Sequence, residues 1–135
     1  MNERDELESI AARWISLWCV PVDWRLFDAL HSDEFEDRAP AARPSTKQGF
    51  AEGLASLVKA FPDLRTTVED LVVDEAGARV AVRWRAIGTN EAAFLGVGPT
   101  HRQTRITGIE IIEIRGGRIV RRWGEWDISD HRPVA

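Results

Sequence analysis

The sequence of 135 residues contains no tyrosine, one cysteine and one methionine. The single cysteine, Cys19, excludes a disulfide within the chain and is typical of a reducing compartment. No apolar run is long enough to cross a membrane. Cationic residues do not predominate either, because 18 lysines and arginines stand against 22 aspartates and glutamates and give a net charge of −4. That balance argues against a nucleic-acid partner.

The first residues, MNERDELES, are charged and contain no secretory apolar stretch. Together with the lone cysteine, they favour a cytoplasmic protein without membrane attachment. Hydrophobic residues make up 44% and charged residues 30% of the chain, which is the balance of a folded globular protein. The length suits one domain, so we expect residues 1–135 to form a single domain.

The first half of the chain has helical patterns. Apolar residues recur at three- and four-residue spacing over residues 4–19, which predicts an amphipathic helix. Asp23 can cap a shorter second helix. The segment HSDEFEDRAPAARPS then has the composition of a short strand followed by a loop. A third helix is predicted to start at Ser45, with Gln48 completing a capping box, and to end at Pro62.

The second half of the chain has extended patterns rich in β-branched and aromatic residues. Four strands are predicted, over residues 64–73, 78–88, 104–115 and 118–127. Turn signals separate them, among them the pair Gly116-Gly117. Helices first and strands afterwards predict an α+β fold, in which three N-terminal helices pack on one face of a bent antiparallel sheet.

Several segments together resemble one known family. They are AFPDLRTTVEDLVV at the end of the third helix, GTN and FLGVGPT in the connection at residues 88–100, and the Gly-Arg-Ile turn before the last strand. On these motifs the chain resembles the SnoaL-like polyketide cyclase family, within the superfamily named for nuclear transport factor 2. The resemblance covers nearly the whole chain and implies a cone-shaped fold that encloses one deep apolar pocket.

The resemblance also implies a type of chemistry. Cyclases of this family close a ring by an intramolecular aldol reaction, and they use neither a metal nor a cofactor. A carboxylate removes a proton next to a carbonyl group, and apolar walls raise the pKa of that carboxylate toward the working pH. A second group must hold the developing oxyanion.

The residues of the family's site carry over only in part. The acid/base aspartate of the family stands seven residues after the turn glycine of the last hairpin, a position that is Gly124 here. An assisting histidine on the preceding strand corresponds to Glu110. An asparagine that lines the pocket corresponds to Asp37, and an aromatic position of the first helix corresponds to Trp18. The resemblance therefore carries over the scaffold and not the catalytic pair.

The faces of the last hairpin depend on its register, because a shift of one residue exchanges them. A bulged three-residue turn that ends at Gly117 would pair Glu110 with Arg122, whereas a two-residue turn would pair Glu110 with Trp123. The bulged turn also sets Arg105 opposite Asp127. We favour the bulged turn because it pairs opposite charges.

The favoured register places the pocket side of the last hairpin. Glu110 and Arg122 would form a paired acid and base, although Arg122 lowers the pKa of Glu110 and thereby opposes proton abstraction. A structural ion pair explains the same two residues equally well. Trp126 and Ile112 would line the wall, with Trp18 facing them from the first helix and Gly124 adding space. Asp37 would enter the pocket mouth or lie solvated in a loop.

The opposite side of the hairpin is also apolar, since it carries Ile109, Ile111 and Trp123. The helices cover only one face of the sheet, so we expect the outer face to form a homodimer.

Other chemistries find little support in the sequence. His31, His101 and His131 are far apart and lack metal-ligand spacing, which argues against a metal site. No nucleophile elbow is present, and GVGPT lacks the lysine of a phosphate loop. Cys19 adjoins the apolar stripe of the first helix and is most simply a core residue.

Three functional hypotheses follow. The first is a protein that binds a small apolar, aromatic or polyketide-like carbonyl compound, with cofactor-free aldol cyclase or isomerase chemistry. The second is a ligand-binding or dimerisation module without chemistry, which the glycine at position 124 makes credible. The third is an epoxide hydrolase-like enzyme, which needs an arginine between two acids and would use Asp37, Glu110 and Arg122.

Overall fold

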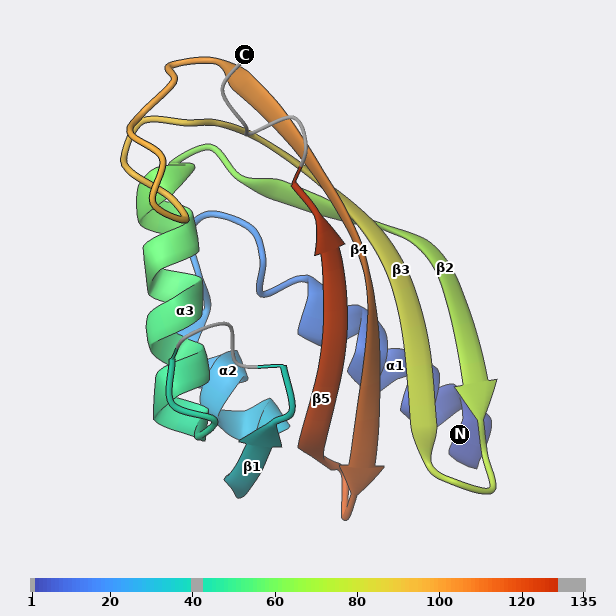
Figure 1. Ribbon diagram of the computed structural model, residues 1–135. Coiled ribbons are helices and arrows are strands. Elements are labelled where there is room, and N and C mark those ends of the chain that lie inside the picture. Colours follow the sequence, from blue (N-terminus) through green and yellow to red (C-terminus); the bar gives the residue numbers. More distant parts are fainter. Residues whose placement is uncertain (1, 40–42, 129–135) are drawn as a thin grey trace.

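The computed structural model describes residues 2–39 and 43–128 (Figure 1). Within them the chain has the α+β class expected from the sequence, with three helices and five strands. In chain order these are α1 (Glu3–Ile15), α2 (Trp24–Leu30), β1 (His31–Asp37), α3 (Lys47–Ala60), β2 (Arg65–Asp74), β3 (Arg79–Thr89), β4 (Gln103–Arg115) and β5 (Arg118–Asp127). The last four strands agree with their predicted bounds to within one residue.

The first helix is shorter than predicted. It ends at Ile15, after which the amides of Leu17 and Trp18 donate to the carbonyls of Trp14 and Ile15 at 3.1 and 3.0 Å. These turns keep both side chains in the core, so the apolar spacing continues beyond the helix itself. Among the described residues, no helix combines the length and the apolar character needed to cross a membrane.

The caps of the other two helices are partly as predicted. Asp23 caps α2 through its side chain, as expected. The cap of α3 is Thr46 and not Ser45, because the Thr46 hydroxyl accepts from the Gly49 amide at 3.1 Å. The predicted capping box is absent, since the Gln48 side chain reaches along the helix and not back to the cap. Thr46 performs the capping alone.

The five strands form one sheet in the order β1-β5-β4-β3-β2. Its four C-terminal strands pair antiparallel, as predicted, whereas β1 pairs parallel with β5. The prediction of an entirely antiparallel sheet is therefore wrong at this edge. The alternation within a short strand does not reveal which distant strand lies beside it, or in which direction.

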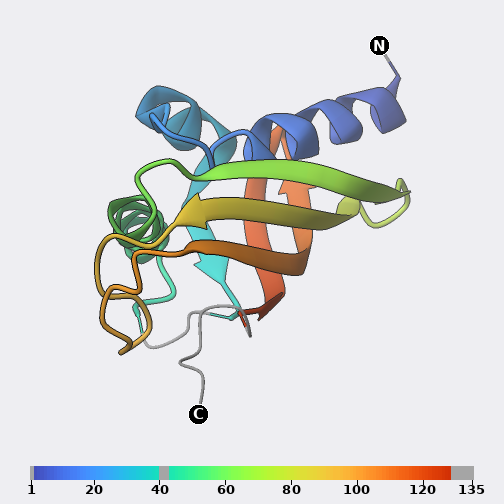
Figure 2. The same cartoon turned by 90° about the horizontal axis from the view of Figure 1, so that it is seen from above.

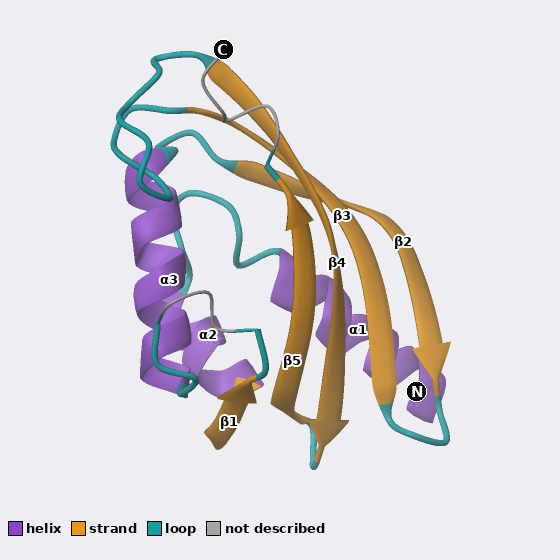
Figure 3. Cartoon of the chain, viewed as in Figure 1, coloured by secondary structure: helices purple, strands orange, loops and turns teal. Residues whose placement is uncertain are grey.

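The three helices cover the same side of the strongly bent sheet (Figures 1 and 2). Helix α1 packs against β2 and β3, and α3 packs against β1. The connection between β3 and β4 folds over the C-terminal end of α3 (Figure 3), where the Glu91 amide donates to the Ala60 carbonyl at 2.8 Å. Buried Asn90 holds this connection by donating to Ala92 and accepting from Thr100.

The last hairpin has a two-residue turn. Gly116 and Gly117 both adopt positive φ, at 58° and 76°, so Arg115 pairs directly with Arg118. Left-handed backbone at two successive residues is the conformation that glycine adopts without strain. The favoured bulged three-residue turn is therefore wrong.

A bulge in β5 nevertheless restores the predicted faces. Glu113 pairs with Arg121, which leaves Val120 as the extra residue, and Glu110 then pairs with Gly124. The pairing of Glu110 with Arg122 is wrong by two positions, and an even shift keeps each side chain on its face. Arg122 and Glu110 consequently share the inner face, as predicted, while Trp123 lies partly exposed on the outer face.

A histidine lies within the aromatic part of the core. His31 is fully buried, and its Nε2 accepts from Trp14 Nε1 at 2.9 Å. Its Nδ1 lies 2.7 Å from the Phe27 carbonyl, to which it donates. Burial, reinforced by the charge of Lys47, lowers the pKa of His31 from 6.5 to about 4. The folded protein thus holds His31 as the neutral imidazole.

We predict that acid weakens the fold through His31. The unfolded chain binds a proton at this residue below pH 6.5, whereas the folded chain resists it until about pH 4, so stability is lost as the pH falls through this window. The free energy of unfolding should fall by about 2 kcal/mol between pH 7.5 and pH 5 from this group alone. Urea denaturation at the two pH values measures the change.

The matched variant is His31→Gln, whose amide can still accept from Trp14 but does not titrate. Between pH 7.5 and pH 5, the free energy of unfolding of this variant should fall by about 2 kcal/mol less than that of the parent protein. Identical pH dependence in both proteins would show that His31 is not the responsible group.

Candidate functional site

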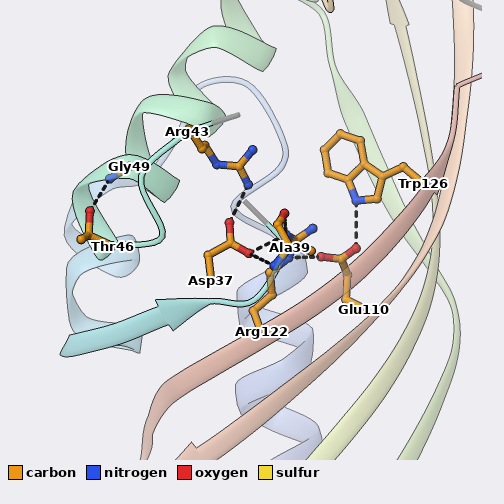
Figure 4. Close-up of polar contacts among 8 residues, drawn as sticks. All are labelled: Asp37, Ala39, Arg43, Thr46, Gly49, Glu110, Arg122 and Trp126. Atoms are coloured by element: carbon orange, nitrogen blue, oxygen red, sulfur yellow. Dashed lines mark hydrogen bonds and ion pairs between the residues drawn. The ribbon is translucent and has the colours of Figure 1, made fainter. Parts of the chain in front are cut away.

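Arg122 is buried on β5 and joins acids from two other strands. Its Nε donates to Glu110 Oε1 on β4 at 2.6 Å, and its Nη1 donates to Asp37 Oδ1 on β1 at 2.9 Å. Nη1 also donates to the Ala39 carbonyl at 3.1 Å. Figure 4 shows Arg122 between the two carboxylates. The three polar candidates from the sequence therefore lie in one buried network.

The parallel edge of the sheet places Asp37 in this network. Asp37 and Arg122 are partners in the pairing of β1 with β5, and the Arg38 amide donates to the Arg122 carbonyl at 2.8 Å. Only 1% of Asp37 is exposed, so it is not the solvated loop residue that was the alternative. Its Oδ1 also accepts from the Ala39 amide at 3.0 Å.

Glu110 is held by donors on both of its oxygens. Oε1 accepts from Arg122, and Oε2 accepts from Trp126 Nε1 at 2.8 Å. The Trp126 ring meets Trp84 edge to face, with centroids 5.1 Å apart. The two indoles thus shield the Glu110 carboxylate from solvent, and Trp126 also donates a hydrogen bond to its Oε2.

Burial is the largest influence on Glu110 and raises its pKa above the ordinary value, although the charge and hydrogen bond of Arg122 and the hydrogen bonds of Trp126 and Trp84 act in the opposite direction. The pKa of Arg122 is raised: burial opposes its charge, but the acids Glu110 and Asp37 outweigh that effect. Arginine and tryptophan side chains can only donate, so a protonated Glu110 would present its proton to groups unable to accept it. We therefore describe Glu110 as a carboxylate fixed by an ion pair.

Gly124 lies directly across from Glu110 and does not add free space, contrary to the prediction. A Cβ atom built on Gly124 would lie 2.7 Å from Glu110 Cδ and would also overlap Glu110 Oε2 and Arg122 Nη2. The carboxylate and the guanidinium occupy the volume that a side chain at this position would need. The glycine is what permits the ion pair to lie flat against β5.

Two hollows adjoin the network. The inner one measures about 10 Å³ and has Glu110 in its lining, so it is no larger than one water molecule. The outer one is a groove of about 420 Å³ that has Arg122, Gly124 and Phe50 in its lining. Trp18 and Trp126 line both hollows and lie at their boundary.

Sequence reasoning missed Arg43, which lies in the segment between β1 and α3. It lines the groove, and its Nη2 donates to Asp37 Oδ2 at 2.7 Å. Arg43 and Arg122 both stack over the Phe50 ring, with guanidinium carbons 5.6 and 5.3 Å from its centroid. An arginine in a loop has no periodic signal, so only the folded chain reveals this position.

The remaining candidates from the sequence divide between groove and core. Trp18 and Trp126 line the groove. Ile112 is fully buried and belongs to the lining of neither hollow. Glu125 is exposed and also lines the groove.

Residues 2–39 and 43–128 hold no group of three or more His, Cys, Asp or Glu side chains that could bind a metal ion. His31 is bound within the aromatic core, and His101 pairs with Glu91 on the surface at 3.2 Å. His131 lies outside the described residues.

Comparisons with known proteins agree with this architecture. The model of the family described as SnoaL-like polyketide cyclase matches residues 9–132. A comparison with curated protein sequences gave no match. Several solved structures share the fold, as the following three illustrate.

TsrD from Streptomyces laurentii superposes with a TM-score of 0.84 at 21% identity, over 97% of this chain and 95% of its own. IdmH, a putative polyketide cyclase from Streptomyces antibioticus, gives 0.78 at 27% identity, over 92% of this chain and 94% of its own. AclR, a putative hydroxylase from Streptomyces galilaeus, gives 0.82 at 20% identity, over 95% of this chain and 83% of its own.

We predict that Gly124→Ala destabilises the protein by about 1–3 kcal/mol, because the new methyl group overlaps a buried ion pair that cannot move freely. Gly98→Ala is the matched control, since a Cβ at Gly98 would meet no atom within 4 Å. The control should stay within about 0.5 kcal/mol of the parent protein in urea denaturation. An equally small effect at both positions would show that Glu110 and Arg122 do not fill the space over Gly124.

Proposed function

We propose a ligand-binding function for this chain, which belongs to the SnoaL-like polyketide cyclase family. The ligand is a small, largely apolar carbonyl compound of aromatic or polyketide-like character. It lies in the groove beside β5, where the aromatic walls enclose its body and Arg122 binds its carbonyl oxygen. The observation that carries this proposal is a guanidinium with a spare donor in the floor of an otherwise mainly apolar groove.

The groove has the size and lining that such a ligand needs. Its volume of about 420 Å³ falls within the range of small-molecule sites. Trp18, Phe50 and Trp126 supply aromatic surface, and Leu54 and Leu57 supply aliphatic surface. Apolar walls of this kind select size and shape, and a few polar groups fix the orientation.

Arg122 provides the fixed polar group. Its Nε and Nη1 are occupied by Glu110 and Asp37, whereas Nη2 has no hydrogen-bond partner among the described residues. Nη2 lies over Gly124, another groove residue. A ligand carbonyl oxygen in the groove beside Nη2 would accept a hydrogen bond from this guanidinium, which Glu110 and Asp37 hold in place. This hydrogen bond would polarise the carbonyl group.

The proposal extends to binding and carbonyl polarisation and not to aldol ring closure or isomerisation. Those reactions need a carboxylate that can take a proton from carbon. Gly124 has no side chain, and the Glu110 carboxylate is engaged by Arg122 and Trp126. Glu125 is exposed and lacks an apolar enclosure. The geometry therefore favours a binding module over a cyclase.

The arrangement for epoxide hydrolysis is assembled only in part. Arg122 does lie between two acids, Asp37 and Glu110. However, Asp37 is absent from the linings of the hollows, and its two oxygens bind Arg122 and Arg43. An acid that must activate water beside a bound epoxide has to face the ligand, so we do not extend the proposal to this reaction.

We also propose that the protein forms a homodimer through the outer face of its sheet. Val72, Ala81, Ile111 and Trp123 are consecutive pairing partners across four strands and form an apolar row on this face. Of these, Val72 is 61%, Ile111 37% and Trp123 36% exposed. A contiguous exposed apolar row of this kind is typical of a surface covered by another protein.

We predict that light scattering after gel filtration, at micromolar concentration, gives twice the chain mass of 15.2 kDa. Ile111→Lys should yield the monomer, because it places a charge in the middle of the apolar row. The control Val20→Lys changes another exposed apolar residue, outside the sheet, and should leave the dimer intact. A monomeric parent protein would refute this interface.

We predict that 2-acetylnaphthalene, a flat aromatic ketone, binds in the groove and changes tryptophan fluorescence in a saturable way, since Trp18 and Trp126 line it. Ala39→Phe should weaken the affinity at least about tenfold, because it adds a ring at the groove mouth without altering the backbone contacts of Ala39.

The matched control is Ala76→Phe, which adds the same ring at an exposed turn away from the groove. It should bind the ketone as the parent protein does. The proposal fails if the parent protein shows no saturable change, or if both variants lose affinity equally.

A further inference from the structure

We propose that the ligand of the groove carries an acidic group, a carboxylate, which Arg43 and Arg122 bind together. This inference rests on the proposed ligand-binding function and narrows its ligand class from apolar carbonyl compounds to apolar carboxylic acids. Two guanidinium groups, rather than one, line the same groove, and each has donors without a hydrogen-bond partner among the described residues.

The two arginines converge from different segments on one carboxylate and one ring. Arg43 Nη2 binds Asp37 Oδ2, and Arg122 Nη1 binds Asp37 Oδ1. Both guanidinium groups also lie over Phe50. Asp37 and Phe50 therefore fix the spacing of the pair, and Figure 4 shows Asp37 bridging it. The site is built before any ligand arrives, which reduces the entropy lost on binding.

The pair has donors that remain unused. Among the described residues, Arg43 Nε, which is buried, and Arg43 Nη1 have no hydrogen-bond partner. Arg122 Nη2 has none there either. Donors of buried or half-buried groups are almost always satisfied in folded proteins, so the Nη atoms of two arginines that line a groove suit a ligand with acceptor oxygens. A carboxylate can accept from several donors at once, whereas a ketone oxygen offers only two lone pairs.

The charges of the site agree with an anionic ligand. Two guanidinium groups face two buried carboxylates, Asp37 and Glu110, so the network is neutral by itself. Neither carboxylate belongs to the lining of the groove, in which the exposed Glu125 is the one acid among the described residues, against the two arginines. A ligand anion would therefore meet the cationic edges first. Burying that anion among apolar walls costs little only when it is paired with fixed donors of this kind.

The rest of the lining defines what the acid is attached to. Figure 4 shows Arg43 and Trp126 on either side of Arg122. Trp18, Leu57 and Phe94 belong to the apolar lining of the same groove. A ligand with its carboxylate at the two arginines would place its apolar body against the indoles. Amphipathic acids of aromatic or polyketide type fit this division.

The test compares three probes that share one ring system. 2-Naphthoate carries the acid, methyl 2-naphthoate masks it, and 2-acetylnaphthalene is the neutral ketone of the preceding proposal. Titration at pH 7 with tryptophan fluorescence should give a dissociation constant for 2-naphthoate that is roughly tenfold or more below that of its methyl ester. Raising the salt concentration should reduce the difference between the dissociation constants of 2-naphthoate and its methyl ester.

The matched variants are Arg43→Met and Arg38→Met. Arg43 lines the groove, whereas the neighbouring Arg38 pairs with Glu36 on the surface. Arg43→Met should reduce the preference for the acid over its methyl ester to about twofold or less. Arg38→Met should keep the full preference. The comparison of acid with ester in the parent protein does not depend on whether either variant folds.

Each outcome bears on one proposal. If the ketone binds but the acid binds no more tightly than its ester, this inference is overturned and the ligand-binding function stands. An acid preference that survives in Arg43→Met also overturns it, because the anion then lies elsewhere. If none of the three probes binds, the ligand-binding function fails and this inference fails with it.

Discussion

The buried ion pairs of Arg122 are the interaction on which the rest of the site depends. One guanidinium joins β1, β4 and β5 through Asp37 and Glu110. Burying three charges is costly unless each is paired and hydrogen-bonded, and removing one partner from such a network typically costs about 3–5 kcal/mol. These ion pairs form only if β1 pairs with β5, if the Asp37 side chain points toward Arg122, and if position 124 has no side chain.

The same arrangement determines what the groove can do. An acid that binds a fixed arginine is a good structural anchor and a poor proton acceptor, because the positive charge stabilises its deprotonated form. Glu110 is bound by Arg122 on one oxygen and by Trp126 on the other. In the proposed function, Arg122 keeps one hydrogen-bond donor for a ligand in the groove, and the described lining of the groove contains no enclosed carboxylate.

The family relation and the chemistry of the site therefore carry different information. The family model and the solved neighbours, which include proteins described as putative polyketide cyclases and a putative hydroxylase, agree on the fold. A fold of this kind supplies apolar walls and leaves the reaction to a few side chains. In this chain, Asp37 bridges two arginines, and we propose that this pair recognises an oxygen-bearing ligand.

The sequence by itself determined the elements. Apolar spacing, the Asp23 cap and the glycine pair are local signals, so the helices and the four long strands could be predicted. The inward side of Glu110, Arg122 and Trp126 was predicted from a turn that the structure does not have, and the bulge in β5 restores it. The resemblance to the family, carried by short motifs, was confirmed by the match over residues 9–132. Only the tertiary structure decided the parallel edge strand, the bulge at Val120, the burial of Asp37 and the position of Arg43. Each of these depends on contacts between residues far apart in the chain, where charge pairing and packing outweigh local preference.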